Sequence, residues 1–396
     1  MELGNFFLSV LILIAVGLAW YSGYRTRIKS HYSLTKNDHK DYFIGLNYLL
    51  NDEPDQSIDA FISSLEINST TLESHLALGD LLRRRGKVDG SIAVYQKLLA
   101  ISQLDNKELN QVKLGLVKSY VAAGLFDRAE KLIDELKVAD TKIQIAALKI
   151  GLTVYQLEKE WQKAIKAANH LLKLSMPNER QEIQAKASHF YCELAEKELD
   201  LQHYNQAKEY LSKARNMDKA NVRTSLILGK LEFEQANYKQ AIKALLKIST
   251  QNPSFTAEAF DLIIASYQAL NNHKKIQKFI EHSLEDPLSA GLLLKVIQYI
   301  KGSEGRGKAK EVLFQRIESK PSIELLGQAI LLNDNAEIDP NAEKFHEILT
   351  NYLESKTKYQ CGSCGFELKS LHWQCPGCNE WGFIKPIDPF IKEVDG

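Results

Sequence analysis

The 396-residue chain has only five cysteines, and four of them fall within eighteen residues near its C-terminus. Its fifty basic and fifty acidic residues cancel, so the composition offers no excess of positive charge for nucleic acid. The chain also lacks a glycine-rich phosphate loop, a His-Glu-x-x-His motif and a Gly-x-Ser-x-Gly motif. We therefore expect neither a nucleic-acid partner nor an enzyme with one of these common active sites.

One pair of side chains in the middle of the sequence could carry nucleophilic chemistry. His189 and Cys192 lie one helical turn apart in the stretch HFYCELA, which is the spacing of a base and a nucleophile on one helix face. The alternative is that Cys192 is a small core residue on an apolar face. We favour this alternative, and we predict that the protein has no catalytic residues and is not an enzyme.

A long apolar run occupies the N-terminal region from Leu3 to Tyr21. As a helix this run would be ~28 Å long, which is enough to cross the hydrocarbon core of a membrane. A cleaved signal peptide would need a basic segment before the run, and only Glu2 stands there. We predict that residues 1–24 form an uncleaved transmembrane anchor.

The basic residues that flank this run predict its orientation. Arg25, Arg27 and Lys29 follow the run within a basic juxtamembrane linker, residues 25–37, whereas no base precedes it. The positive-inside rule then places the bulk of the chain in the cytoplasm and the N-terminus on the opposite side of the membrane. Because the cytoplasm is reducing, structural disulfides are not expected there.

From residue 38 onward, one pattern returns about every 34 residues. The recurring small or apolar positions are Ser57, Ser91, Ala129, Ala164, Ala207, Ala241, Ile276 and Ala309. A period near 34 with small residues at these positions is typical of tetratricopeptide repeats, each a pair of antiparallel helices. We predict an all-α superhelix of about eight to nine repeats over residues 38–354, with a concave surface for binding.

The packing of two helices explains the small residues. A small side chain early in the second helix lets the two backbones approach closely, and an aromatic residue just before it fills the turn (Phe126, Trp161, Tyr204 and Tyr238). One spacing is 43 residues, which predicts a longer loop or helix near Pro177. A break over 332–341 is expected to precede a last helix over 341–353.

The clustered cysteines are expected to bind a metal ion. Two Cys-x-x-Cys pairs, Cys361 with Cys364 and Cys375 with Cys378, would place four thiolates at the tips of two turns. Gly365 and Gly377, together with Asn379, suit the tight backbone of such turns. A tetrahedron of four thiolates takes either zinc or a single iron. We predict that residues 355–396 form a rubredoxin-like or zinc-ribbon module that depends on this metal for folding.

This module is also expected to pack against the repeats. Only residues 355–359 separate the last predicted helix from the first cysteine, so the module has little reach. We expect it to pack against the last repeats or near the mouth of their concave face. Its apolar and aromatic residues exceed what so small a module can bury by itself, and some should cover the repeats or a partner: Phe366, Leu371, Trp373, Trp381 and Phe383.

The order of anchor, repeats and C-terminal metal module resembles the lipopolysaccharide assembly protein B family. Local stretches such as HLALGDLLRRRGKVDGSI and CPGCNEWGFIKPI carry the resemblance, which covers the whole chain. It implies a non-catalytic regulator of lipopolysaccharide synthesis in a Gram-negative inner membrane. The implied partners are the membrane ATP-dependent metalloprotease, the lipid A deacetylase that it degrades and other lipopolysaccharide-synthesis proteins. The resemblance also implies that Cys361, Cys364, Cys375 and Cys378 bind iron.

Two other functions are compatible with the same sequence. An iron-bound module docked on repeats could transfer electrons, although no flavin or redox partner domain is recognisable in the chain. A membrane-associated, chaperone-type scaffold without a dedicated client is the third interpretation. The residues by themselves indicate only a membrane-anchored scaffold, and the pathway comes from the resemblance.

Overall fold

The computed structural model describes residues 72–101, 104–285, 289–319, 323–332 and 355–387, with a few positions between 344 and 352. The predicted anchor 1–24, the linker 25–37 and the first repeat around Ser57 lie outside these residues. So do most of the last predicted helix and all of the predicted break over 332–341 except Leu332. None of the described helices is both long and apolar enough to cross a membrane. The chain divides into two compact units, Met1–Val154 and Tyr155–Gly396, and each is considered by itself.

The described part of the first unit consists of paired helices. Its elements are α3 (Leu72–Arg84), α4 (Val88–Leu99), α5 (Asn106–Ala122), α6 (Phe126–Glu135), the 3₁₀ helix η1 (Leu136–Val138) and α7 (Thr141–Leu157), which ends in the second unit. Tyr95 of α4 packs into the space left by two glycines, since a side chain at Gly79 or Gly115 would overlap its ring. A fully buried hydrogen bond, from Ser91 to the Gly79 carbonyl at 2.7 Å, also joins α3 to α4.

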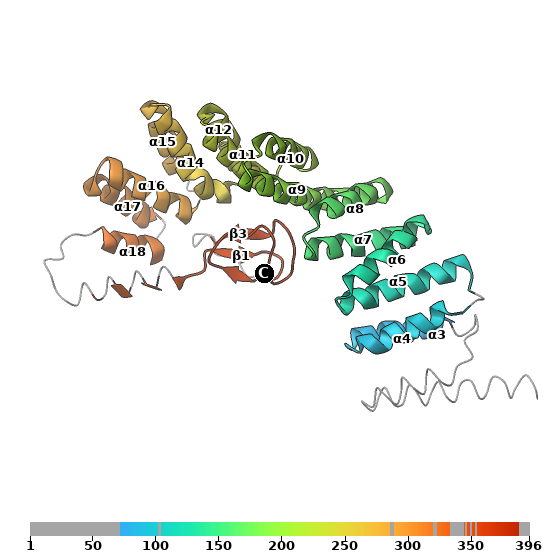
Figure 1. The fold of residues 1–396 in the computed structure, drawn as a ribbon. Helices are drawn as coiled ribbons and strands as arrows, with labels where there is room; N and C mark the ends of the chain where they lie inside the picture. Colours follow the sequence, from blue (N-terminus) through green and yellow to red (C-terminus); the bar gives the residue numbers. More distant parts are fainter. Residues whose placement is uncertain are drawn as a thin grey trace, which may run out of the picture. The chain divides into compact units, whose positions relative to one another are not determined.

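The second unit continues the paired helices and ends in a small sheet (Figure 1). Its helices are α8 (Trp161–Leu174), α9 (Pro177–Asp200), α10 (Tyr204–Met217), α11 (Val222–Glu234), α12 (Tyr238–Leu245), α13 (Ile248–Gln251), η2 (Pro253–Phe255), α14 (Thr256–Ala269), α15 (His273–Glu285), α16 (Ala290–Ser303), α17 (Arg306–Ser319) and α18 (Ile323–Leu331). Pro177 is the first residue of α9, a 24-residue helix, so the 43-residue spacing reflects a longer helix.

The predicted small positions are confirmed in the described repeats. Each is the fourth residue of the second helix of a pair and is almost completely buried: Ser91, Ala129, Ala164, Ala207, Ala241, Ile276 and Ala309. Each predicted aromatic residue is the first residue of such a helix. A side chain larger than alanine at most of these positions would push the two helices apart, which explains the choice of residue.

The turn within each described pair uses a left-handed residue. These residues have φ between 49° and 93° and are Gly86, Gly124, Lys159, Gln202, Ala236, Asn271 and Gly305. At most of them the next residue donates its N–H to a carbonyl five positions back, as Glu160 does to Tyr155 at 2.8 Å. This bond ends the first helix and turns the chain into the second. The described helices therefore form a tetratricopeptide-repeat array.

The C-terminal sheet has three short antiparallel strands in the order β2-β1-β3. They are β1 (Tyr359–Cys361), β2 (Glu367–Leu368) and β3 (Ile384–Pro386). In the register, Tyr359 pairs with Leu368 on one side and with Pro386 on the other. The core of this small domain is Tyr359, Cys361, Leu368, Cys375 and Ile384, so two of its five buried residues are cysteines.

Candidate metal centre

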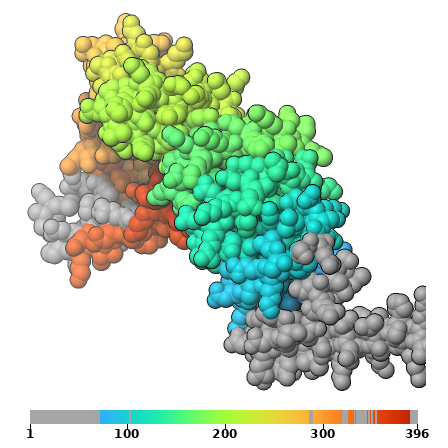
Figure 2. Space-filling model, turned by 45° about the vertical axis from the view of Figure 1, so that its right-hand side comes forward, coloured from blue at the N-terminus to red at the C-terminus, as the bar shows by residue number. Residues whose placement is uncertain are grey.

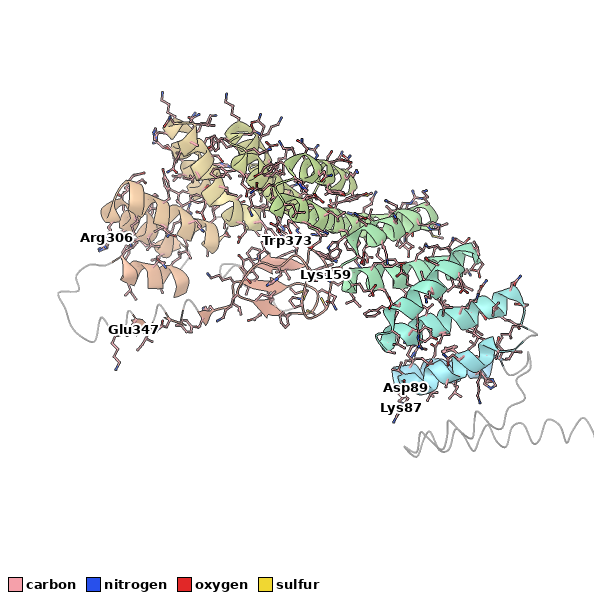
Figure 3. All side chains as sticks on the ribbon, in the orientation of Figure 1. Lys87, Asp89, Lys159, Arg306, Glu347 and Trp373 are labelled. Carbon is pink, nitrogen blue, oxygen red and sulfur yellow. The ribbon has the colours of Figure 1, made fainter. Side chains whose placement is uncertain are left out.

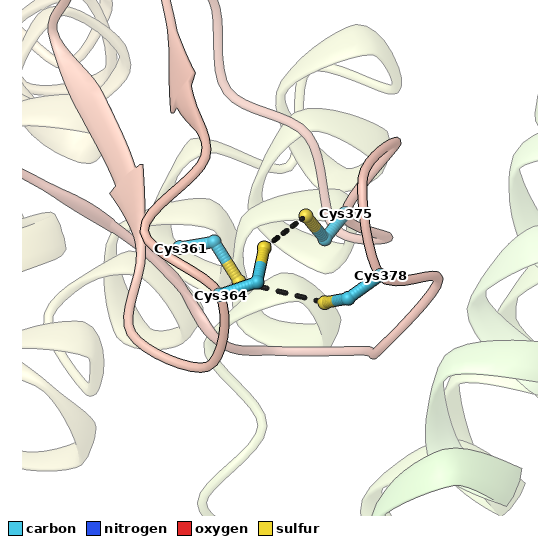
Figure 4. A group of neighbouring side chains, drawn as sticks. All are labelled: Cys361, Cys364, Cys375 and Cys378. Carbon is cyan, nitrogen blue, oxygen red and sulfur yellow. Dashed lines mark hydrogen bonds between the residues drawn. The ribbon is translucent and has the colours of Figure 1, made fainter.

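Two loops of the small domain bring the four cysteines together (Figure 4). Cys361 ends β1, and Cys364 lies on the turn that follows it; Cys375 and Cys378 lie on the second loop, which precedes β3. All four sulfur atoms lie within 4.8 Å of one another. The Sγ atoms of Cys361 and Cys378 are 3.8 Å apart, and those of Cys364 and Cys375 are 3.6 Å apart.

These distances fit a tetrahedral thiolate site. A metal ion with four M–S bonds of about 2.3 Å would separate its sulfur ligands by about 3.8 Å. A disulfide would need an S–S distance of about 2.05 Å, and all four cysteines are free. The four cysteines are therefore positioned to hold one metal ion through four thiolates. The ion would supply the folding energy that a core of five residues does not.

The two loops have the same backbone geometry. Gly365 and Asn379 both have a left-handed φ, 76° and 59°, and each donates its N–H to the carbonyl of the first cysteine of its pair at 2.8 Å. Asn tolerates this region better than most residues with a side chain, which explains how it can stand in a glycine position.

Gly377 was expected to allow the tight backbone of the second cysteine turn, and this expectation was wrong. Gly377 is not among the described glycines with positive φ. A side-chain carbon there would lie 3.1 Å from the Phe366 ring, so this glycine provides space for an aromatic neighbour.

The protein environment prepares at least one thiol to ionise. Burial opposes loss of the Cys361 proton, but the backbone N–H groups of Cys364 and Ser363 reverse this effect and lower the pKa of the thiol to about 7. At Cys364 a backbone hydrogen bond from Phe366 favours the thiolate, yet burial and the three neighbouring sulfurs raise the pKa to about 12. The Cys364 thiol therefore keeps its proton at neutral pH unless a cation lies among the sulfurs.

Trp381 docks the metal domain on the repeats. Its side chain is 6% exposed and lies in a recess formed by Trp161 of α8, His189 and Phe190 of α9 and Arg223 of α11. The ring centroids are 5.2 Å from His189 in a stacked arrangement and 5.9 Å from Trp161 and from Phe190, both edge-on. The Arg223 guanidinium carbon is 5.8 Å from the indole centroid. This set of side chains is called the indole recess below.

Three polar contacts surround the recess. Gln156 Nε2 donates to the Asn379 carbonyl at 3.0 Å, and Lys186 Nζ pairs with Glu380 at 3.1 Å. The Tyr359 hydroxyl donates to Glu258 of α14 at 2.6 Å, and burial followed by this carboxylate raises the pKa of the phenol. On the domain side these contacts come from the second cysteine loop and from the start of β1, and on the repeat side they come from three different helices, which fixes the orientation of the domain.

A second tryptophan extends the contact toward α14. Trp373 stacks on Phe255 of η2 with ring centroids 5.6 Å apart, and Trp373 and Leu371 pack against the apolar core of the later helices. Figure 3 shows Trp373 on the side of the domain that faces the helices, and in Figure 2 the red atoms of the domain abut the green atoms of the repeats.

The predicted docking is confirmed, but the domain does not pack against the last repeats, which were one of its two expected locations. The contacts lie on α8, α9, α11 and α14, in the middle of the described array, and not on the last repeats. The short linker does not determine where the domain docks. The docking residues Trp373 and Trp381 come later in the sequence than the linker. Phe366 and Phe383 do not take part and are 45% and 47% exposed.

His189 and Cys192 do not form a nucleophile pair. Cys192 is fully buried, its hydrogen-bond partner is Thr224 at 3.3 Å, and burial raises the pKa of its thiol to about 11. His189 stacks on Trp381, and burial followed by the charge of Arg223 lowers its pKa to about 3. A protonated thiol without a base cannot act as a nucleophile, so Cys192 is a core residue.

A repeat position that sequence reasoning missed supplies three docking residues. His189, Arg223 and Glu258 each lie eighteen residues before the recurring small or apolar position of their repeat, which is Ala207, Ala241 or Ile276. Arg223 is 3% exposed and pairs with Glu193 at 2.7 Å and with Glu196 at 2.5 Å. Ionisable residues at one repeat position of three successive copies were the signal that could have identified this surface.

Fold and site together define a tetratricopeptide-repeat protein with a rubredoxin-like, four-cysteine metal domain docked on its repeats. Residues 359–386 match the family described as the rubredoxin metal binding domain. The chain is 30% identical over 384 residues to Lipopolysaccharide assembly protein B of Escherichia coli strain K12, with 96% of this chain and 97% of that protein covered. The chain belongs to the lipopolysaccharide assembly protein B family.

Two further similarities complete the comparison. The protein of the same name from Haemophilus influenzae is 29% identical over 396 residues, with 96% of this chain and 98% of that protein covered. A crystal structure of a tetratricopeptide repeat protein from Parabacteroides merdae is 15% identical, with a TM-score of 0.33, and covers 72% of this chain and 100% of that one.

Proposed function

We propose that this protein is a non-enzymatic adaptor that regulates lipopolysaccharide synthesis at the inner membrane. The observation that carries the proposal is the match to Lipopolysaccharide assembly protein B over 96% of the chain, which includes the repeats and the metal domain. Repeat arrays of this kind bind other proteins along extended surfaces, so an adaptor role suits the fold.

The partners proposed are a membrane ATP-dependent metalloprotease and the deacetylase that commits precursors to lipid A. The adaptor would hold the deacetylase near the protease and thereby limit its level. It would also gather other lipopolysaccharide-synthesis proteins at the membrane. Confinement to the membrane by the proposed anchor would favour this role, because it would raise the local concentration of partners and let weak contacts suffice.

The proposed topology follows the charge around the apolar run. Residues 1–24 would cross the inner membrane once, with the N-terminus in the periplasm and the repeats and metal domain in the cytoplasm. Four free thiols in the metal domain agree with a reducing compartment. A reporter fused after Gly396 should behave as cytoplasmic, and cleavage of such a fusion by protease added outside intact spheroplasts would contradict the topology.

Iron is the proposed metal, by likeness to rubredoxins, with zinc as the alternative. Both ions accept four thiolates in a tetrahedron, so the sulfur distances do not separate them. Metal analysis of protein purified under anaerobic conditions from its own cells decides between the two. An equivalent of zinc without iron would contradict the iron assignment and leave the adaptor role intact.

The half-life of the deacetylase tests the adaptor proposal. Depletion of the protein should lengthen that half-life in cells with an active metalloprotease and change nothing in cells whose protease is inactive. Capture of both partners from solubilised membranes should depend on the repeats. An unchanged half-life on depletion would contradict the proposal.

An electron-transfer function is the second candidate, and the exposed position of Cys364 favours it, because one edge of the centre reaches solvent. A reversible redox change of the purified protein at a potential within the cellular range would support it. A zinc-loaded protein that is fully active in cells would exclude it.

A further inference from the structure

The second cysteine loop carries metal ligands and docking contacts on consecutive residues. Cys375 and Cys378 are followed at once by Asn379, Glu380 and Trp381. Through these three residues the loop meets Gln156, Lys186 and the indole recess, all of which belong to the repeats. No spacer separates the two roles, so the loop cannot change its metal-binding conformation without disturbing its contacts with the helices.

The backbone of this loop transmits the contact to the sulfurs. The Asn379 N–H donates to the Cys375 carbonyl at 2.8 Å, and the Cys375 N–H donates to the Glu380 carbonyl at 2.9 Å. Gln156 and Lys186 thus hold the two residues that close the turn around Cys375 and Cys378. Gly382 follows with φ 73°, and a side-chain carbon there would lie 3.1 Å from His189 Nε2.

The indole recess contains buried polar atoms that weaken docking. Within the described part of the chain, the buried Trp381 Nε1, His189 Nδ1 and Arg223 Nη1 atoms have no hydrogen-bond partner. These unpaired buried polar atoms offset part of what burial of the Trp381 indole contributes to docking. Metal binding adds to docking, because the small domain has a core of only five residues and four thiolates that share one ion hold its two loops together.

We propose that the repeats form part of the metal site and set its affinity. Gln156 and Lys186 are positioning residues, and metal binding in return holds Trp381 in the indole recess. Because such coupling is reciprocal, docking strengthens metal binding by the same factor by which metal binding strengthens docking. Removal of the metal releases the second loop and exposes the recess to water.

Zinc affinity of the full-length protein tests the first half of the proposal. The variant Gln156→Ala/Lys186→Ala changes only repeat side chains and leaves every cysteine and the recess in place. We expect roughly a 10-fold loss of zinc affinity, measured by competition with a chromophoric chelator, as for other residues that orient metal ligands. An affinity within about twofold of the parent's, the size of a negligible coupling, would overturn the proposal.

Glu182→Ala is the matched control. Glu182 is the other carboxylate that pairs with Lys186, at 3.0 Å, and it is largely exposed. Its removal leaves the Lys186–Glu380 pair in place, so zinc affinity should stay at the parent value. A loss in the control equal to that in the double variant would also overturn the proposal, because a general disturbance of the α9 surface, and not loss of the contacts with Asn379 and Glu380, would then explain both.

Hydrogen exchange tests the reverse direction of the coupling. Chelation of the metal from the parent protein should speed exchange of the α9 amides around His189 and shift tryptophan fluorescence to longer wavelength as Trp381 meets water. Far-ultraviolet circular dichroism should show that the helices persist. Unchanged exchange and fluorescence after complete metal removal would show that the domain docks without metal and would overturn the coupling.

Discussion

Trp381 contacts three aromatic side chains and a cation of the repeats, although only two residues separate it from Cys378. Its indole is buried away from water in a recess whose walls are largely aromatic. The burial of so large a side chain is worth a few kcal/mol. At the scale of single residues, the metal ligands and the docking tryptophan therefore act as one group.

Replacement of Cys375 by serine should remove the metal. Cys375 is fully buried and belongs to the core of the small domain, so three remaining thiolates would leave the site open to water and much weaker. Metal analysis should then show less than one equivalent, with helical circular dichroism retained. Cys192→Ala is the control and should keep the metal, because Cys192 lies in the helical core. A full equivalent in Cys375→Ser would contradict the site.

Protonation of His189 should weaken the folded state at mildly acidic pH. Burial and Arg223 lower its folded pKa to about 3, whereas the unfolded side chain titrates near 6.5. Since the unfolded state binds the proton first, this stability is present above pH 6.5 and is lost as the pH falls toward 3. Between pH 7 and pH 5 the loss should be about 2 kcal/mol.

Urea unfolding of the parent and of His189→Gln at both pH values measures this loss. The variant lacks the titrating ring, so the difference between the two proteins isolates His189 from the thiols and carboxylates that titrate in the same range. An equal pH dependence of both proteins would show that His189 does not contribute.

At the scale of the element, the repeated unit is a helix, a left-handed residue and a second helix. Two of the described turns within the first unit use glycine, whereas the turn before α12 uses Ala236 with φ 59°. An L-residue in this region costs about 1–2 kcal/mol relative to the right-handed helix. The turn is kept because its hydrogen bond, from Asn237 to the Glu232 carbonyl at 2.8 Å, ends α11 and starts α12.

Ala236→Gly should therefore stabilise the protein by about 0.5–1 kcal/mol, the relief of backbone strain less the extra freedom of glycine in the unfolded chain. Gly124→Ala makes the opposite change in a turn where nothing lies within 4 Å of the new carbon, and it should cost about 1 kcal/mol. Thermal unfolding of both variants checks the pair. A loss of stability in Ala236→Gly would show that the alanine side chain is needed at this turn.

At the scale of the whole molecule, the periodicity of the sequence predicted the helices. It could not predict contacts between residues that are far apart in the sequence. The small residues recur because each pair of helices solves the same packing problem, so a single sequence shows them. The four cysteines were predictable because a metal requires its ligands in two tight turns. The docking surface was not, since His189, Arg223 and Glu258 contact residues of the metal domain that lie more than a hundred positions away in the sequence. The role of Gly377 likewise depends on where Phe366 lies.

Deletion of residues 1–24 should separate binding from regulation. The shortened protein should bind its partners in solution, because the repeats and metal domain are retained, yet regulate poorly in cells, because the local concentration at the membrane is lost. Deacetylase level at native expression is the measurement. Full regulation by the shortened protein would contradict the tethered mechanism.

The position of the metal domain also has a mechanical consequence. Repeat arrays are elastic because each repeat touches only its neighbours, so bending is shared among many small hinges. Here one small domain contacts α9, α11 and α14, the first helices of three successive repeats. The domain should restrict bending between these neighbouring repeats. This stretch of the array should therefore be stiffer than the rest. A pulling force or a partner that flexes it must first detach Trp381.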